Sequence, residues 1–125
     1  MAIDLAILYE ILRDIAITGR KFHYSDLSTE YHRHTGEWHE PHGTWDGPLG
    51  EINIRAYEHA PKLPPLSAVV TLKPENPGDQ SEPGGLFWGS SPGVPSKPRS
   101  KDERFLCWAA ILRQVYDAEW PPTLA

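Results

Sequence analysis

The clearest pattern in the chain is the helical spacing of hydrophobic residues near both ends. In the first segment these residues are Leu5, Leu8, Leu12 and Ile15. This spacing predicts an amphipathic helix over 4–17, with Asp4 at its N-terminal cap. Residues 100–119 show a similar pattern behind Ser100 and Glu103, whose spacing is typical of a capping box. We therefore expect a long C-terminal helix, which the prolines after it bring to an end.

Two shorter helices are expected between these ends. Ser25 offers an N-terminal cap for a helix that ends at Gly36, a residue suited to the left-handed conformation of a helix terminus. Pro48 is favourable at a first helical position and predicts a helix that continues to Tyr57. With the helix near the start, these segments give three expected N-terminal helices.

The middle of the chain changes from helical to extended character. Prolines between residues 61 and 65 prevent further helix, and the apolar run 67–72 that follows predicts a buried strand. A second short apolar run, 85–90, is expected to pair with it as an antiparallel hairpin with a long loop. The expected fold class is therefore α+β. Three N-terminal helices and one long C-terminal helix would pack around a small antiparallel β-hairpin in a winged-helix-like arrangement.

Length and composition limit the expected number of domains, the classes of partner and the location of the protein. The chain has 125 residues, so a single domain over 1–125 is expected, with mobile loops at about 35–47 and 73–100. Its net charge of −5 argues against sequence-independent binding to nucleic acid, which depends on excess lysine and arginine. Cys107 is the only cysteine and lies in an apolar run, which excludes an internal disulfide and favours a buried thiol. No signal peptide or membrane-spanning segment is evident, so a cytoplasmic location without membrane contact is expected.

The segment 32–45 carries the most suggestive chemistry. It holds four histidines together with Glu37, Glu40, Trp38 and Trp45. Three interpretations remain open: a solvated polar loop, a metal site, or a ligand-facing surface with tryptophan rings for stacking. The histidine spacing fits no recognised zinc pattern, so no metal ligand is assigned.

Glycines mark two further places where another backbone or a ligand could approach closely. Gly50 interrupts the expected helix that begins at Pro48, at a cost of about 1 kcal/mol relative to alanine. The pair Gly84–Gly85 lies just before an aromatic run. The full set of candidate ligand-binding residues is Trp38, His39, His42, Trp45, Gly50, Asn53, Gly84, Gly85 and Trp88. No catalytic residue and no cofactor are assigned.

Several short motifs are similar to those of a group of small, uncharacterised bacterial and mobile-element proteins. They are Phe22-His-Tyr-Ser-Asp-Leu27, Pro48-Leu-Gly-Glu-Ile-Asn53, Leu63-Pro-Pro-Leu-Ser-Ala-Val-Val70, Pro77-Gly78, Gly84-Gly85-Leu86 and Arg113-Gln-Val-Tyr-Asp-Ala-Glu-Trp-Pro-Pro122. The resemblance implies no activity, and the histidine- and tryptophan-rich segment before Pro48 departs from it. A looser resemblance links the N-terminal half to the helix-turn-helix part of alkyltransferase-like proteins. The Pro-Cys-His-Arg motif of those proteins is absent, which argues against alkyl transfer.

These observations favour a small, non-catalytic binding protein of bacterial or mobile-element origin. Its partner would be a nucleotide-like ligand or a protein, bound through a surface rich in tryptophan, histidine and glycine. One alternative is a metal-dependent hydrolase that uses the histidine and glutamate cluster. Another is a DNA-binding protein with a helix-turn-helix, although Asn53 and Arg55 are accompanied by acidic residues on the candidate recognition helix.

Overall fold

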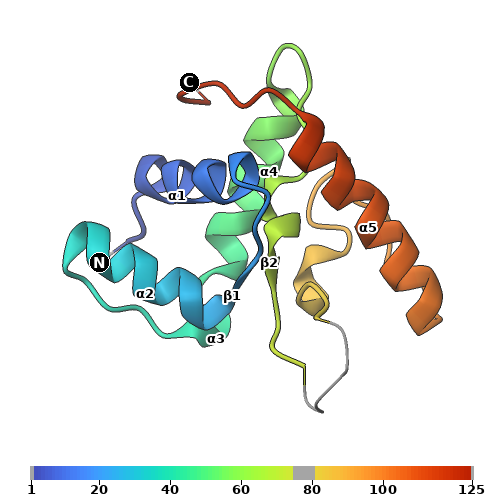
Figure 1. Ribbon diagram of the computed structural model, residues 1–125, viewed down its shortest axis with the longest axis horizontal. Coiled ribbons are helices and arrows are strands. Elements are labelled where there is room, and N and C mark those ends of the chain that lie inside the picture. Colours follow the sequence, from blue (N-terminus) through green and yellow to red (C-terminus); the bar gives the residue numbers. More distant parts are fainter. Residues whose placement is uncertain (1, 75–80, 125) are drawn as a thin grey trace.

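The computed structural model describes residues 2–74 and 81–124, and its elements are mostly helices (Figure 1). In chain order they are α1 (Leu5–Ile17), β1 (Phe22–His23), α2 (Tyr24–Thr35), α3 (Pro41–Thr44), α4 (Asp46–Glu58), the 3-10 helix η1 (Leu66–Val69), β2 (Val70–Thr71), the 3-10 helix η2 (Gly85–Phe87) and α5 (Lys101–Asp117). α3 is a single turn in which two residues have non-helical backbone angles.

The four longer helices form where hydrophobic spacing and end signals coincide. The Asp4 carboxylate accepts hydrogen bonds from the amides of Ala6 and Ile7 and so caps α1. The Ser100 hydroxyl accepts from the Glu103 amide at the start of α5. These two predicted caps are confirmed. α2 differs in that it begins at Tyr24 and not after Ser25, so its N-cap is the residue that ends β1.

The predicted antiparallel hairpin is wrong. The two described strands, β1 and β2, run parallel, with Phe22 opposite Val70 and His23 opposite Thr71. The run expected as the second strand of the hairpin contains η2. Antiparallel pairing in the described residues is confined to one isolated bridge between Leu72 and Glu82. The described fold is therefore helical with a two-stranded parallel ladder, and the winged-helix-like α+β expectation does not hold.

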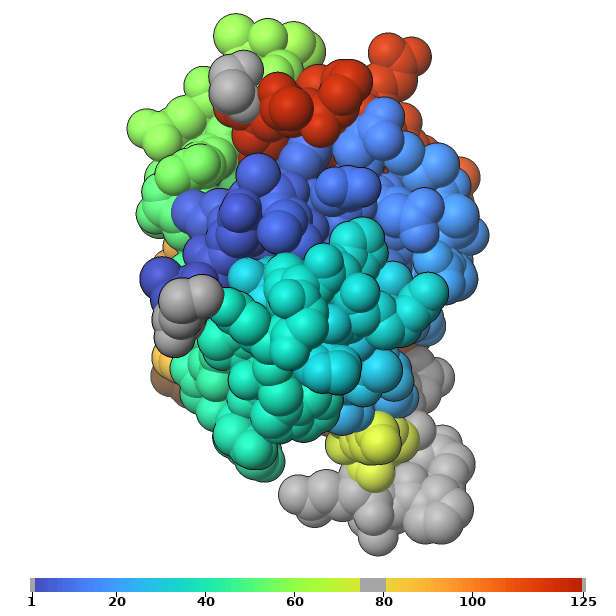
Figure 2. Space-filling view, turned by 90° about the vertical axis from the view of Figure 1, so that its left-hand side faces the viewer, coloured from blue at the N-terminus to red at the C-terminus, as the bar shows by residue number. Residues whose placement is uncertain are grey.

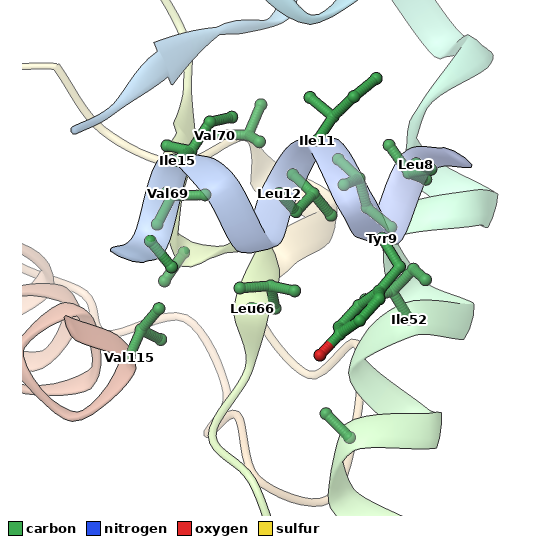
Figure 3. Close-up of a cluster of buried hydrophobic side chains, with 14 of the residues drawn as sticks. Leu8, Tyr9, Ile11, Leu12, Ile15, Ile52, Leu66, Val69, Val70 and Val115 are labelled. Carbon is green, nitrogen blue, oxygen red and sulfur yellow. The ribbon is translucent and has the colours of Figure 1, made fainter. Parts of the chain in front are cut away.

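The failure of the hairpin has a physical cause in the central run 66–71. Every residue of this run is buried, so its sequence has no alternation that separates a strand from a short helix. η1 occupies the middle of the molecule, where it contacts α1, α4 and α5. Figure 3 shows Leu66, Val69 and Val70 beside the side chains of α1. The Trp108 indole of α5 donates to the Ala68 carbonyl at 2.9 Å and fixes η1 from the other side.

The C-terminal tail closes the core over α1. Trp120 is buried, and its carbonyl accepts a hydrogen bond from Nε of Arg13 at 3.0 Å. The Tyr9 hydroxyl donates to the Pro121 carbonyl. The tail therefore joins the two ends of the chain, and Figure 1 shows it crossing toward the α1 and α4 side of the molecule.

The first expected mobile loop, at about 35–47, lies within the described residues, whereas the second is described only in part. The first contains α3 and Trp45, whose side chain is fully buried. In the second, residues 75–80, which include Pro77 and Gly78, lie outside the described residues. In the described part of the chain, no helix has the length and apolarity that a membrane crossing requires.

Candidate functional site

A pocket of about 680 Å³ lies where α2 and α4 begin. It is lined by His23, Tyr24, Ser25, Pro41, His42, Gly43, Asp46, Leu72, Lys73, Gly84, Gly85 and Leu86. The pocket therefore combines four stretches of sequence: 23–25, 41–46, 72–73 and 84–86. Figure 2 shows a face to which α1 (dark blue), α2 and the segment after α2 (cyan to green) contribute, with yellow residues of the third stretch at its lower edge.

The parallel ladder brings the first and third of these stretches together. His23 lies opposite Thr71, and the two side chains meet at 3.3 Å between Nδ1 and Oγ1. The His23 amide donates to the Asp26 carboxylate at 3.0 Å, which holds the first turn of α2. The residues after the ladder, Tyr24 on one side and Leu72 on the other, then enter the pocket lining.

Tyr24 is closely packed against the glycine turn. A Cβ atom added to Gly84 would lie 2.7 Å from the Tyr24 hydroxyl oxygen, so only glycine fits there without movement. Burial raises the pKa of Tyr24 to about 12, with a further rise from the Asp46 charge and a lowering by the Gly84 backbone hydrogen bond. The hydroxyl therefore stays neutral at physiological pH and keeps a proton to donate.

Asp46 is the first residue of α4 and is half-buried. A carboxylate in the first turn of a helix interacts favourably with the helix dipole. Among the residues that the structure describes, its carboxylate has no hydrogen-bond or ion-pair partner. Two acceptor oxygens are thus available close to the Tyr24 hydroxyl.

Exposed leucines give the pocket an apolar rim. Leu86 is 68% exposed and Leu72 is 46% exposed, and Pro41 adds a rigid apolar surface. A ligand between them would cover apolar area that is now in water.

A second, much smaller crevice of about 10 Å³ lies behind the pocket. It shares Tyr24, Asp46 and Leu86 with the pocket and is also lined by Gly50 and Ser67. Its volume is about that of a single water molecule.

The structure brings together some of the residues predicted from the sequence. His42, Gly84 and Gly85 line the pocket, and Gly50 lines the crevice behind it. Gly50 faces open space and not a crossing helix, because a Cβ added there would meet no atom within 4 Å.

The two tryptophans of the histidine-rich segment lie elsewhere. Trp45 is fully buried, and its indole donates to Ser28 Oγ at 2.8 Å. The ring of His39 lies 6.0 Å from Trp45 and 5.4 Å from Tyr31, centroid to centroid, so it packs on the core. Trp38 is 52% exposed and contacts the ring of His32 edge-on. None of these three predicted residues contributes to the pocket lining.

Asn53 and Trp88 also lie outside the pocket lining. Asn53 is buried, and its amide donates to the hydroxyls of Ser67 and Ser90 while its oxygen accepts from the Ser67 amide. Both N–H groups of this side chain are therefore used within the protein. Trp88 packs edge-on against Phe87, with ring centroids 5.2 Å apart.

The sequence interpretation missed the polar residues that form the inner wall of the pocket. His23, Tyr24 and Asp46 are absent from the set of candidate ligand-binding residues predicted from the sequence. Their only sequence signal is a polar or aromatic residue at the start of a helix. The described residues contain no group of three histidine, cysteine or acidic side chains arranged to hold a metal.

Comparisons with known proteins identify no relative of this chain. No protein-family model, no curated protein and no solved structure matches this chain.

Proposed function

We propose that this protein is a non-catalytic binding protein whose pocket accepts a nucleotide-like small molecule. The observation that carries the proposal is the combination of about 680 Å³ of hollow volume with an apolar rim and a polar inner wall. Small-molecule sites have volumes of about 300–1,000 Å³ and combine apolar walls with a few polar groups. Leu72, Leu86 and Pro41 would contact the faces of a planar ring, and Tyr24 and Asp46 would meet its polar edge.

The electrostatics of the pocket favour a ligand that also carries negative charge. α2 and α4 both begin at the pocket, but acidic side chains already occupy their first turns, Asp26 in α2 and Asp46 in α4. The groups that attract a negative charge are therefore basic side chains. His23, His42 and Lys73 are further lining residues that can donate hydrogen bonds to phosphate oxygens.

The raised pKa of Tyr24 argues against a role for this residue as a general base or nucleophile near neutral pH. A general base or nucleophile for work near neutral pH needs a pKa near or below that range. The pKa of Tyr24 is raised to about 12, so its hydroxyl suits hydrogen-bond donation.

The proposal is tested with Leu86→Ser and a matched control, Leu106→Ser. Leu86 and Leu106 are 68% and 67% exposed, but only Leu86 lines the pocket. Calorimetry against nucleosides, nucleoside monophosphates and cyclic nucleotides should detect a ligand. Leu86→Ser should weaken its affinity about fivefold, which corresponds to roughly 1 kcal/mol of lost apolar contact. Leu106→Ser should leave the affinity unchanged. An absence of binding across the panel, or equal losses in both variants, would refute the proposal.

A further inference from the structure

The inner wall of the pocket presents a defined pattern of hydrogen-bond donors and acceptors. Tyr24 and Asp46 both line the pocket and the crevice behind it. They are close enough for the Asp46 charge to raise the pKa of Tyr24. The pattern is therefore one neutral hydroxyl donor beside one carboxylate with two acceptor oxygens.

The conformation of each group is constrained by its surroundings. Tyr24 packs directly against the glycine turn, where a Cβ added to Gly84 would lie 2.7 Å from the hydroxyl oxygen, and the neutral hydroxyl has a proton to donate. Asp46 is held at the first position of α4, directly after the fully buried Trp45. Within the described residues no cation or amide engages its carboxylate. A buried or half-buried carboxylate of this kind gains stability from a ligand that donates two hydrogen bonds.

The four common nucleobases differ in the order of donors and acceptors along their pairing edges. Guanine presents an acceptor followed by two donors, whereas uracil presents acceptor, donor, acceptor. Cytosine presents one donor and two acceptors, and adenine one donor and one acceptor. Only the guanine order complements one hydroxyl donor and one carboxylate with two acceptors.

We propose that the pocket selects a guanine-type edge, with Tyr24 donating to the ring carbonyl and Asp46 accepting from the two N–H groups beside it. This inference rests on the proposed function, because it names the class of nucleotide-like ligand that the same pocket takes. Asp46 is thus the specificity-determining residue. The phosphate or other charged end of the ligand would then point toward His42 and Lys73, which line the same pocket.

The test compares Asp46→Asn with Asp102→Asn. Asp102 is also an acidic residue in the first turn of a helix, but it does not line the pocket. Circular dichroism establishes that both variants fold. Calorimetry then measures binding of guanosine, xanthosine, adenosine, cytidine and uridine to each protein. Xanthosine is included because the side-chain amide that Asp46→Asn introduces has an oxygen to accept from the N1–H of xanthine and an N–H to donate to its adjacent carbonyl.

The expected result is a guanosine preference of about 5- to 150-fold in the wild type, the range that a bidentate contact gives. Asp46→Asn should lose this preference and favour xanthosine, and Asp102→Asn should retain it. If nucleosides bind without a guanosine preference, or if the preference survives Asp46→Asn, the assigned edge is wrong while the binding function stands. If no nucleoside and no nucleotide binds, both proposals fail.

Discussion

Replacing Asn53 with alanine should destabilise the protein strongly, because this side chain connects three parts of the core. Its Nδ2 donates to Ser67 Oγ at 2.7 Å and to Ser90 Oγ at 3.2 Å, and its Oδ1 accepts from the Ser67 amide at 3.0 Å. Asn53→Ala leaves the buried Ser67 amide without a partner, at a cost of about 1–3 kcal/mol. Each of the other two bonds contributes about 0.5–1.5 kcal/mol. A total loss of about 3 kcal/mol is expected, a large share of the roughly 5–15 kcal/mol that stabilises a typical domain.

Urea unfolding followed by tryptophan fluorescence and circular dichroism measures this loss. The control is Glu51→Ala on the same helix, which removes a salt bridge to Arg55 between side chains that are 46% and 50% exposed. That change should cost less than about 1 kcal/mol. A loss below about 0.5 kcal/mol for Asn53→Ala would show that the network adds little to stability and would refute this reasoning.

The same position allows a second test based on pH. Asn53→Asp keeps an acceptor for the Ser67 amide, and its protonated carboxyl group can still donate to one of the two hydroxyls. Burial raises the pKa of such a carboxyl group above its unfolded value. Relative to the wild type, the variant should therefore lose stability as pH rises from about 5 to 8, because only the unfolded chain ionises freely there. A stability difference that is independent of pH would contradict the burial of this side chain.

Two further predictions concern the glycine turn and its tyrosine. Gly84→Ala should lower the free energy of unfolding by about 1–3 kcal/mol, because the new Cβ would lie 2.7 Å from the Tyr24 hydroxyl oxygen. Gly85→Ala serves as the control, because a Cβ at that position meets no atom within 4 Å. Tyr24→Phe removes that oxygen, so in a double-mutant cycle Gly84→Ala should cost less stability in the Tyr24→Phe background than in the wild type. Strictly additive losses would contradict the contact. Because the pKa of Tyr24 is raised from 10.0 to about 12, the wild type should lose more stability than Tyr24→Phe as pH rises above 10. Burial also raises the pKa values of Tyr9 and Tyr116, so ultraviolet absorbance should show one late-ionising tyrosine fewer in Tyr24→Phe than in the wild type. Identical alkaline curves for the two proteins would contradict this pKa.

The parts of the fold that could be predicted from the sequence are those fixed by neighbours along the chain. α1 and α5 combine a helical stripe of apolar residues with a capping side chain, and both signals are local. The central run 66–71 gives no such signal, because all of its residues are buried and its partners come from three distant helices. Its mixture of 3-10 helix and parallel ladder follows from tertiary contacts that no short window contains.

The candidate site also depends on contacts between residues that are far apart in the sequence. Tyr24 reaches the glycine turn about Gly84, although most of the chain's middle separates them in sequence. The histidine-rich segment gave a strong chemical signal, but Trp45 and His39 pack on Tyr31 in the core. An indole N–H that finds a partner such as Ser28 is as stable inside a protein as on its surface. Composition alone therefore cannot decide which tryptophan faces a ligand.

The contacts that build the core also position the pocket. The ladder pairs His23 with Thr71, which sets Tyr24 beside Leu72 and Lys73 at the mouth. The buried Trp45 anchors the start of α4 and thereby places Asp46 at the inner wall. Side-chain packing resists small displacements because protein interiors are close-packed. The donor and acceptor pair at the inner wall is therefore held by residues that need not touch a ligand themselves, and its geometry depends on the same burial that stabilises the fold.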